Sequence, residues 1–102
     1  MPTLKVFEEL DSWNKARQFT KLIYAISSVD PFMRDFSLRD QIRRAGISVM
    51  SNIAEGFERG GSREFLRHLS IAKGSIGEVR SQLYIALDQR YLSGSDFAFL
   101  KN

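Results

Sequence analysis

The sequence holds 102 residues, of which 15 are Lys or Arg, 12 are Asp or Glu, one is His and none is Cys. This length predicts a single domain over residues 1–102, and a hydrophobic content of 43% excludes a disordered chain. The lack of cysteine excludes disulfides and thiolate chemistry. No apolar run is long enough to span a bilayer and no secretory signal is visible, so we expect a cytoplasmic protein without membrane contact.

Apolar residues recur at three- and four-residue steps along most of the chain, which predicts helices. We expect the first helix over about 10–28, because Pro31 cannot continue it. The second helix is expected over 38–59, with Ser37 as its N-cap and Gly60-Gly61 as its C-terminal stop. The expected inward face of the first helix consists of Trp13, Ala16, Phe19, Ile23 and Ile26.

The second half of the chain repeats this pattern. We expect a third helix over 63–91 with Ser62 as its N-cap. A fourth helix is expected over 95–102, beginning at Ser95 or Asp96 and incomplete. Because helices joined by short loops lie antiparallel to their neighbours, the sequence predicts an all-α, up-down-up-down four-helix bundle whose fourth helix is short or truncated.

The net charge of +3 is concentrated in the middle of the chain. Residues 39–73 hold seven basic against four acidic side chains, whereas the segments on either side are neutral. One interpretation is a solvated bundle face, and the other is a surface for RNA, DNA or another acidic partner, because the planar guanidinium suits phosphate. The candidate nucleic-acid-binding residues are Arg39, Arg43, Arg44, Arg59, Arg63, Arg67 and Lys73.

Two features of the second predicted helix point to a further contact. Its apolar arc is about 200° wide and includes Ile47, Met50 and Ala54, which predicts self-association unless neighbouring helices cover it. The helix also carries a polar stripe, which is either a solvated face or a hydrogen-bonded seam between subunits. The stripe consists of Gln41, Arg44, Ser48, Asn52, Glu55 and Arg59. The candidate oligomer-interface residues are Ile47, Met50, Ala54, Asn52 and Glu55.

Enzyme chemistry finds little support in the residues. His68 is the only histidine and Phe65 stands three residues before it, so the chain lacks a thiol–imidazole pair, a zinc cluster and a Glu-x-x-His motif. No Gly-x-Ser-x-Gly elbow or Gly-rich phosphate loop is present. We interpret His68 as a partly exposed helix residue and predict no catalytic residue, cofactor or metal. An active site at a subunit interface, with several copies of His68 or Glu55, is the alternative.

Several residues together resemble the signature of a known family. In the second predicted helix they are Gln41-Ile42-Arg43-Arg44-Ala45, Ser48 and Asn52-Ile53-Ala54-Glu55-Gly56-Phe57. Elsewhere they are Trp13, Ala16, Glu64-Phe65, Gly74-Ser75, Glu78 and Gln82-Leu83. This set is similar to that of the four-helix bundle family named after proteins encoded in 23S rRNA intervening sequences, and the likeness extends from Phe7 to Leu100.

The resemblance implies an up-down four-helix bundle that assembles into a ring, typically a pentamer, with no established catalytic activity. A related group, the accessory proteins of diversity-generating retroelements, implies a basic pentamer that binds reverse transcriptase and nucleic acid. Together with the charge pattern, this favours a non-catalytic binding or scaffolding protein with RNA as the leading partner. A protein–protein adaptor ring without a nucleic-acid role is the alternative. The short fourth helix and the low net charge depart from the family's pattern.

Overall fold

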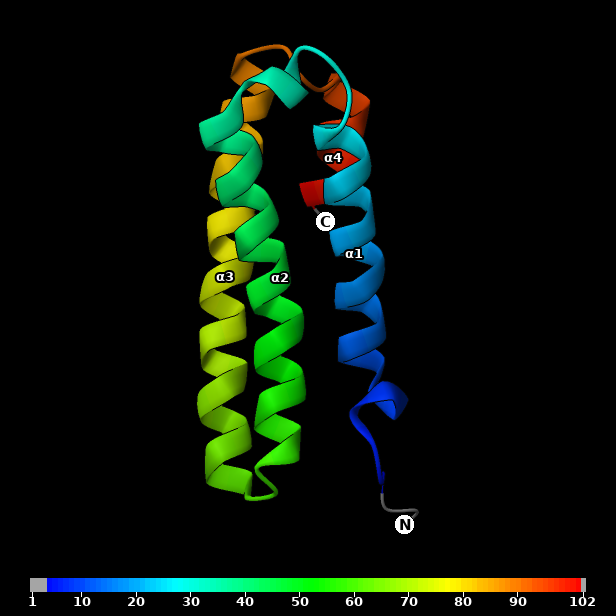
Figure 1. Cartoon of the computed structure of the whole chain (residues 1–102), viewed down its shortest axis with the longest axis vertical. Helices are drawn as coiled ribbons and strands as arrows, with labels where there is room; N and C mark the ends of the chain where they lie inside the picture. Colours follow the sequence, from blue (N-terminus) through cyan, green and yellow to red (C-terminus); the bar gives the residue numbers. More distant parts are fainter. Residues whose placement is uncertain (1–3, 102) are drawn as a thin grey trace.

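The computed structural model describes residues 4–101, and its regular structure within that range is entirely helical. The long helices α1, α2 and α3 stand side by side in alternating directions, and α4 packs beside the end of α1 (Figure 1). This arrangement confirms the predicted all-α bundle with a short fourth helix. The elements are the 3-10 turns η1 (Phe7–Glu9) and η2 (Phe32–Arg34) and the helices α1 (Asp11–Ser27), α2 (Phe36–Glu58), α3 (Ser62–Asp88) and α4 (Gly94–Lys101).

The N-terminus of α2 differs from the prediction, because Asp35 and not Ser37 is its N-cap. The Asp35 carboxylate accepts a hydrogen bond from the backbone N–H of Leu38 at 3.2 Å. Its second oxygen accepts a hydrogen bond from the Tyr91 hydroxyl at 2.9 Å. The Ser37 hydroxyl instead accepts a hydrogen bond from the side-chain amide of Gln41 at 2.9 Å. The helix therefore begins two residues earlier than expected.

The turn between α2 and α3 depends on one glycine. Gly60 adopts a φ of +81°, a left-handed conformation that favours glycine, as the sequence predicted for this C-terminal stop. Gly61 occupies the N-cap position of α3, so the prediction that Ser62 caps this helix was wrong and Ser62 is its first residue. The helix ends at Asp88 rather than near residue 91, and Arg90 just beyond it has a φ of 62°.

The last helix, α4, begins at Gly94, one residue before the predicted start. The Ser93 hydroxyl accepts a hydrogen bond from the backbone N–H of Asp96 at 3.1 Å. Ser93 therefore caps the helix. Although α4 has only 8 residues, it buries Phe97 and Leu100 against the other helices.

The apolar core divides into a large cluster and a small one. The large cluster lies at the end of the bundle that α4 covers, and it includes Ile23, Phe32, Leu38, Ile42, Val79, Leu83, Phe97 and Leu100. The small cluster consists of Ala16, Val49, Ile53 and Ala72. A groove between α1 and α3 lies over this small cluster. None of the described helices is long and apolar enough to cross a membrane.

Candidate functional site

The structure separates the seven predicted nucleic-acid-binding cations into engaged and free side chains. Arg39 is engaged, because its Nε lies 2.9 Å from Asp40 Oδ1 and its Nη1 donates to the Met33 carbonyl at 3.2 Å. Arg43 donates from Nε to Ser27 at 2.8 Å and from Nη2 to Ser28 at 3.0 Å. Its guanidinium also lies over the Tyr24 ring, 4.5 Å from the centroid. These two arginines hold the α1–α2 connection together.

At the opposite end of the bundle, three arginines surround the α2–α3 turn. Arg59 forms an ion pair with Glu55 one helical turn earlier, at 3.1 Å. Arg63 and Arg67 lie in the first turns of α3, and both are exposed. The pKa of Glu55 lies below its ordinary value mainly because Arg59 donates a hydrogen bond to the carboxylate. Electrostatic interactions with His68 and Arg67 lower this pKa further, while desolvation opposes the shift.

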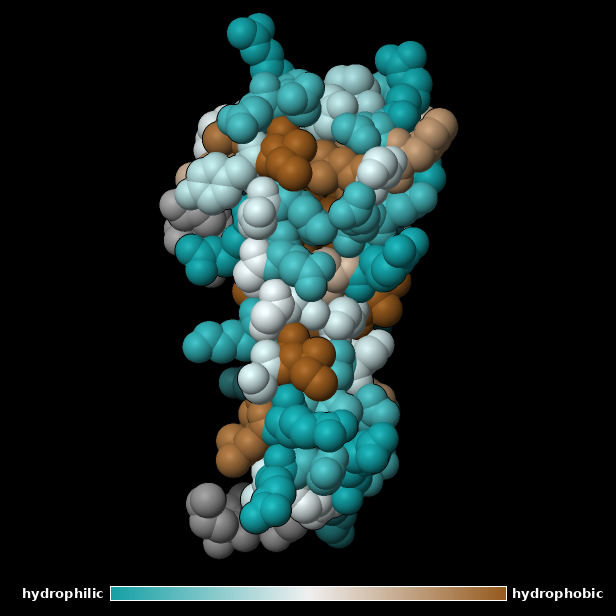
Figure 2. Space-filling view, turned by 90° about the vertical axis from the view of Figure 1, so that its left-hand side faces the viewer, coloured by the Kyte–Doolittle hydropathy of each residue, from teal (hydrophilic) through white to brown (hydrophobic). Residues whose placement is uncertain are grey.

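Four of the seven cations form neither an ion pair nor a side-chain hydrogen bond within residues 4–101: Arg44, Arg63, Arg67 and Lys73. Arg44 lines a polar groove between α2 and α3, whereas Lys73 lines the separate groove between α1 and α3. The face that α3 dominates, on the left of Figure 1, is mostly hydrophilic and carries separate apolar side chains (Figure 2). The structure therefore does not gather the seven residues into one patch.

The polar stripe of α2 is partly buried against α3, within one chain. Asn52 donates from Nδ2 to the Ser48 carbonyl at 2.9 Å, which leaves Oδ1 as its acceptor. His68 Nδ1 lies 3.0 Å from this Oδ1 and therefore carries the proton. Ser75 donates its hydroxyl hydrogen to Ser48 Oγ at 2.8 Å. We call Ser48, Asn52, His68 and Ser75 the polar seam.

The polar seam corrects two interpretations made from the sequence. His68 is buried, with 4% of its surface exposed, and is not a partly exposed helix residue. The contacts of Asn52 lie within the chain, so the stripe is a seam between helices of one subunit at this point and is not a solvated face. Glu55 lies at the edge of the seam, half exposed, with its Oε2 3.8 Å from His68 Nδ1.

Gly56 allows the close contact between α2 and α3 at the polar seam. A Cβ added at this position would lie 2.7 Å from His68 Cβ and 3.2 Å from Phe65 Cδ1. The glycine therefore lets α3 approach α2 closely beside the buried imidazole. Within the run 52–56, Asn52 hydrogen-bonds to His68 and Ile53 packs in the core. Gly56 leaves space for the His68 side chain. Sequence reasoning missed this partnership, although His68 shares a helical stripe with Phe65, Leu69 and Ala72.

The seam continues into a polar groove of about 340 Å³ between α2 and α3. Its lining residues are Gln41, Arg44, Ala45, Ser48, Ser75, Glu78 and Gln82. Among the residues that the structure describes, three buried side-chain atoms on α3 have no hydrogen-bond partner: Glu64 Oε2, His68 Nε2 and Gln82 Oε1. Within the described residues, no group of three or more His, Cys, Asp or Glu side chains is placed to hold a metal ion.

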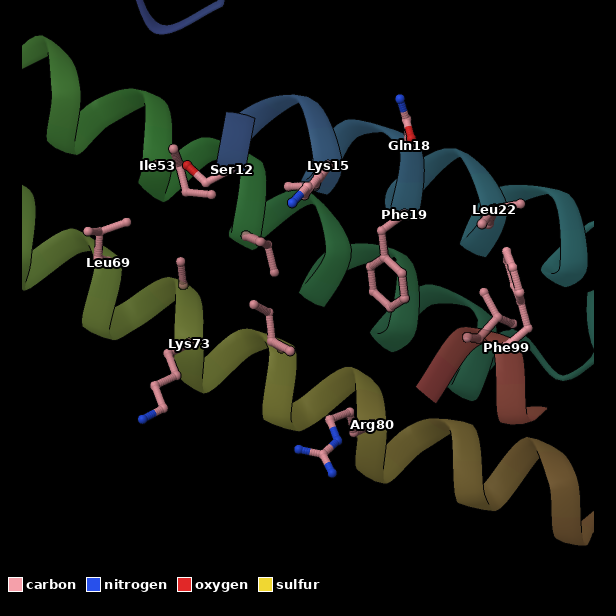
Figure 3. Close-up of a pocket in the computed structure, with 15 residues that line it drawn as sticks. Ser12, Lys15, Gln18, Phe19, Leu22, Ile53, Leu69, Lys73, Arg80 and Phe99 are labelled. Carbon is pink, nitrogen blue, oxygen red and sulfur yellow. The ribbon is translucent and has the colours of Figure 1, made fainter. Parts of the chain in front are cut away.

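The predicted oligomer-interface residues on α2 have different surroundings. Ile47 is 44% exposed, and Ala54 is half-buried. Met50 packs against the small core cluster, so neighbouring helices of its own bundle cover it. On the other side of the molecule, the groove between α1 and α3 has a volume of about 570 Å³ (Figure 3). The interface assignments stay predictions.

The fold and the site define a small helical-bundle protein with a buried polar seam between α2 and α3 and free arginines around it. Residues 8–102 match the model of the family described as 23S rRNA-intervening sequence protein. Because the match covers nearly the whole chain, the protein belongs to this family, as its resemblance in sequence predicted. A search of curated proteins gave no match.

Proposed function

We propose that the protein is a non-catalytic, cytoplasmic homo-oligomer that binds RNA through its phosphate groups, with a pentamer as the favoured assembly. The observation that carries this proposal is the pair Arg63 and Arg67 at the start of α3. Both side chains are exposed and neither forms an ion pair within the described chain, so their donors are available to phosphate oxygens. The family's description, which refers to 23S rRNA, supports RNA as the partner.

The local charge determines what kind of binding this pair provides. Arg63 and Arg67 are four residues apart, so they lie on the same side of α3, about one turn from each other. Glu58 and Glu64 lie in the same region, so the turn is not a uniformly positive surface. Binding therefore depends on individual guanidinium groups, and repetition of the pair around an oligomer adds avidity. Phosphate contacts carry no direct base readout, so sequence preference is weak.

The test is the fluorescence anisotropy of a labelled single-stranded RNA, titrated with protein at several salt concentrations between about 50 and 200 mM. For single strands, each phosphate contact contributes about 0.7 to the slope of log affinity against log salt, so loss of two contacts reduces the slope by roughly 1.4. The variant Arg63→Ser/Arg67→Ser is expected to show this reduction. The matched control is Lys5→Ser/Lys21→Ser, which removes two exposed cations elsewhere and should keep the parent slope.

Equal affinity and slope for parent and Arg63→Ser/Arg67→Ser contradict the assignment of these arginines. Absence of RNA binding by the parent at the lowest salt contradicts RNA binding itself. The second candidate function, a protein–protein adaptor without a nucleic-acid role, then takes its place. The open apolar groove between α1 and α3 favours that candidate, because apolar surface of this kind marks interaction sites.

A further inference from the structure

The polar groove between α2 and α3 has charges of opposite sign on its two walls. The hydrogen-bonded pair Ser48 and Ser75 lies at one end of it. Arg44 lies four residues before Ser48, and Glu78 lies three residues after Ser75. Because the two helices are antiparallel, Arg44 and Glu78 lie at the same level on opposite walls. Both are exposed, and neither forms an ion pair within residues 4–101.

The α3 wall of the groove carries a further acceptor. Gln82 follows Glu78 by one turn on the same side of α3. Among the described residues, its Oε1 is buried and has no hydrogen-bond partner. A buried acceptor without a donor is unfavourable, so a ligand that donates to it gains binding energy. The groove, with a volume of about 340 Å³, therefore suits a ligand that donates hydrogen bonds towards α3 and accepts them from Arg44 on α2.

Guanine has this distribution of hydrogen-bonding groups. Its N1 carries one hydrogen and its 2-amino group carries two, which match the carboxylate oxygens of Glu78 and the amide oxygen of Gln82. Its O6 and N7 are acceptors, and their bidentate contact with arginine is the commonest base-specific contact. Adenine and cytosine present only their amino group as a donor, and uracil presents a single N–H. Guanine is therefore the base that satisfies both walls of the groove.

The groove and the Arg63–Arg67 pair lie on the same face of α3. Glu78 follows Arg67 by eleven residues, which is about 20° more than three full turns and a distance of about 17 Å. Arg67 also acts electrostatically on Glu55 of α2, so this face of α3 lies near α2. A single strand whose phosphates contact the two arginines can therefore continue along α3 to the groove.

We propose that the polar groove binds a guanine base. Arg44 donates to O6 and N7, Glu78 accepts from N1–H and the 2-amino group, and Gln82 Oε1 accepts the remaining amino hydrogen. The proposal rests on the proposed function for RNA as the source of the base, and a free guanine nucleotide is a second source of the same chemistry. Because the phosphate contacts of Arg63 and Arg67 carry no base readout, the groove adds a preference for guanine at one position.

The first test is the fluorescence anisotropy of labelled oligouridines that carry one central guanosine, adenosine or inosine. A bidentate contact discriminates between bases by about 5- to 150-fold, so the parent should bind the guanosine RNA tighter than the adenosine RNA by a factor in this range. Inosine lacks the 2-amino group and should bind more weakly than guanosine. Glu78→Gln should reduce the difference between guanosine and inosine, because the amide offers one acceptor oxygen and no charge.

Arg44→Gln tests the other wall and should reduce the preference for guanosine over adenosine. The matched control is Arg80→Gln, which removes the same charge from an exposed arginine that does not line the polar groove. This control should keep the base preference of the parent. Circular dichroism verifies that the helices persist in each variant. A guanosine preference that both Arg44→Gln and Glu78→Gln leave unchanged contradicts the site.

The second test separates the base from the RNA. Isotope-labelled parent protein is titrated with GMP and, in parallel, with AMP, and its backbone amides are followed by two-dimensional NMR. The amides of Ser48, Ser75 and Gln82 should shift with GMP and stay in place with AMP. If GMP shifts them but no RNA binds, RNA binding is wrong while the guanine site stands. If RNA binds without base preference and GMP moves none of these amides, the guanine site is wrong while the proposed function stands.

Discussion

Replacement of Gly56 by alanine is the sharpest test of the contact between α2 and α3. An added Cβ would lie 2.7 Å from His68 Cβ, an atom attached directly to the backbone of α3. Because no flexible side-chain end can move aside, the two helices must separate or tilt. Overpacking of this kind costs typically about 1–3 kcal/mol. Alanine also favours a helix interior over glycine by about 1 kcal/mol, which offsets part of the cost.

Gly74→Ala separates the two effects. Gly74 lies inside α3, and nothing lies within 4 Å of a Cβ added there. The helix-propensity gain is therefore similar for both substitutions, while only Gly56→Ala meets His68. We expect Gly74→Ala to stabilise the protein by about 0.5–1 kcal/mol. The difference in unfolding free energy between the variants should equal the steric cost of about 1–3 kcal/mol. Urea denaturation measures both, and equal stabilisation by both substitutions would refute the close approach at Gly56.

Two further predictions concern the polar seam. Asn52→Ala removes the acceptor of a buried His68 N–H and should lower the unfolding free energy by about 1–3 kcal/mol, whereas Gln41→Ala on the exposed surface should stay within about 0.5 kcal/mol in the same urea experiment. The lowered pKa of Glu55 stabilises the folded state above pH 4.5, its ordinary value, and this contribution is lost as the pH falls through the lower folded-state pKa. As the pH falls from 5 into the acid range, the unfolding free energy of Glu55→Gln should therefore decrease less than that of the parent. An identical decrease in both proteins would contradict the lowered pKa of Glu55.

The helices were predictable because their apolar periodicity is strong, while their ends depended on contacts far away in sequence. Asp35 and Ser37 are both good N-cap residues, two positions apart. The Tyr91 hydroxyl, 56 residues further along, binds the Asp35 carboxylate and thereby holds it at the cap position. The prediction of Ser37 failed because local sequence does not report such a contact.

The candidate site was predictable only in part, because a count of charges does not say which side chains are engaged. Arg43 and Arg44 are neighbours in sequence, yet the first binds two serines of the α1 end and the second is exposed without an ion pair. Their positions differ by 100° around the helix, which decides the outcome. The burial of His68 follows from the apolar stripe that it shares with Leu69 and Ala72, whereas the chemistry of a single imidazole indicates nothing about its burial.

The polar seam links the family's signature to the placement of the free arginines. Two hydrogen bonds, between Asn52 and His68 and between Ser75 and Ser48, join α2 to α3. In each pair the two residues lie at nearly equal distances in sequence from the Gly60–Gly61 turn, so the hydrogen bonds fix the antiparallel register of α2 and α3. This register sets Arg67 beside Glu55, whose pKa responds to its charge. The signature residues thus determine the positions of the arginines, although none of the residues of the polar seam is itself exposed.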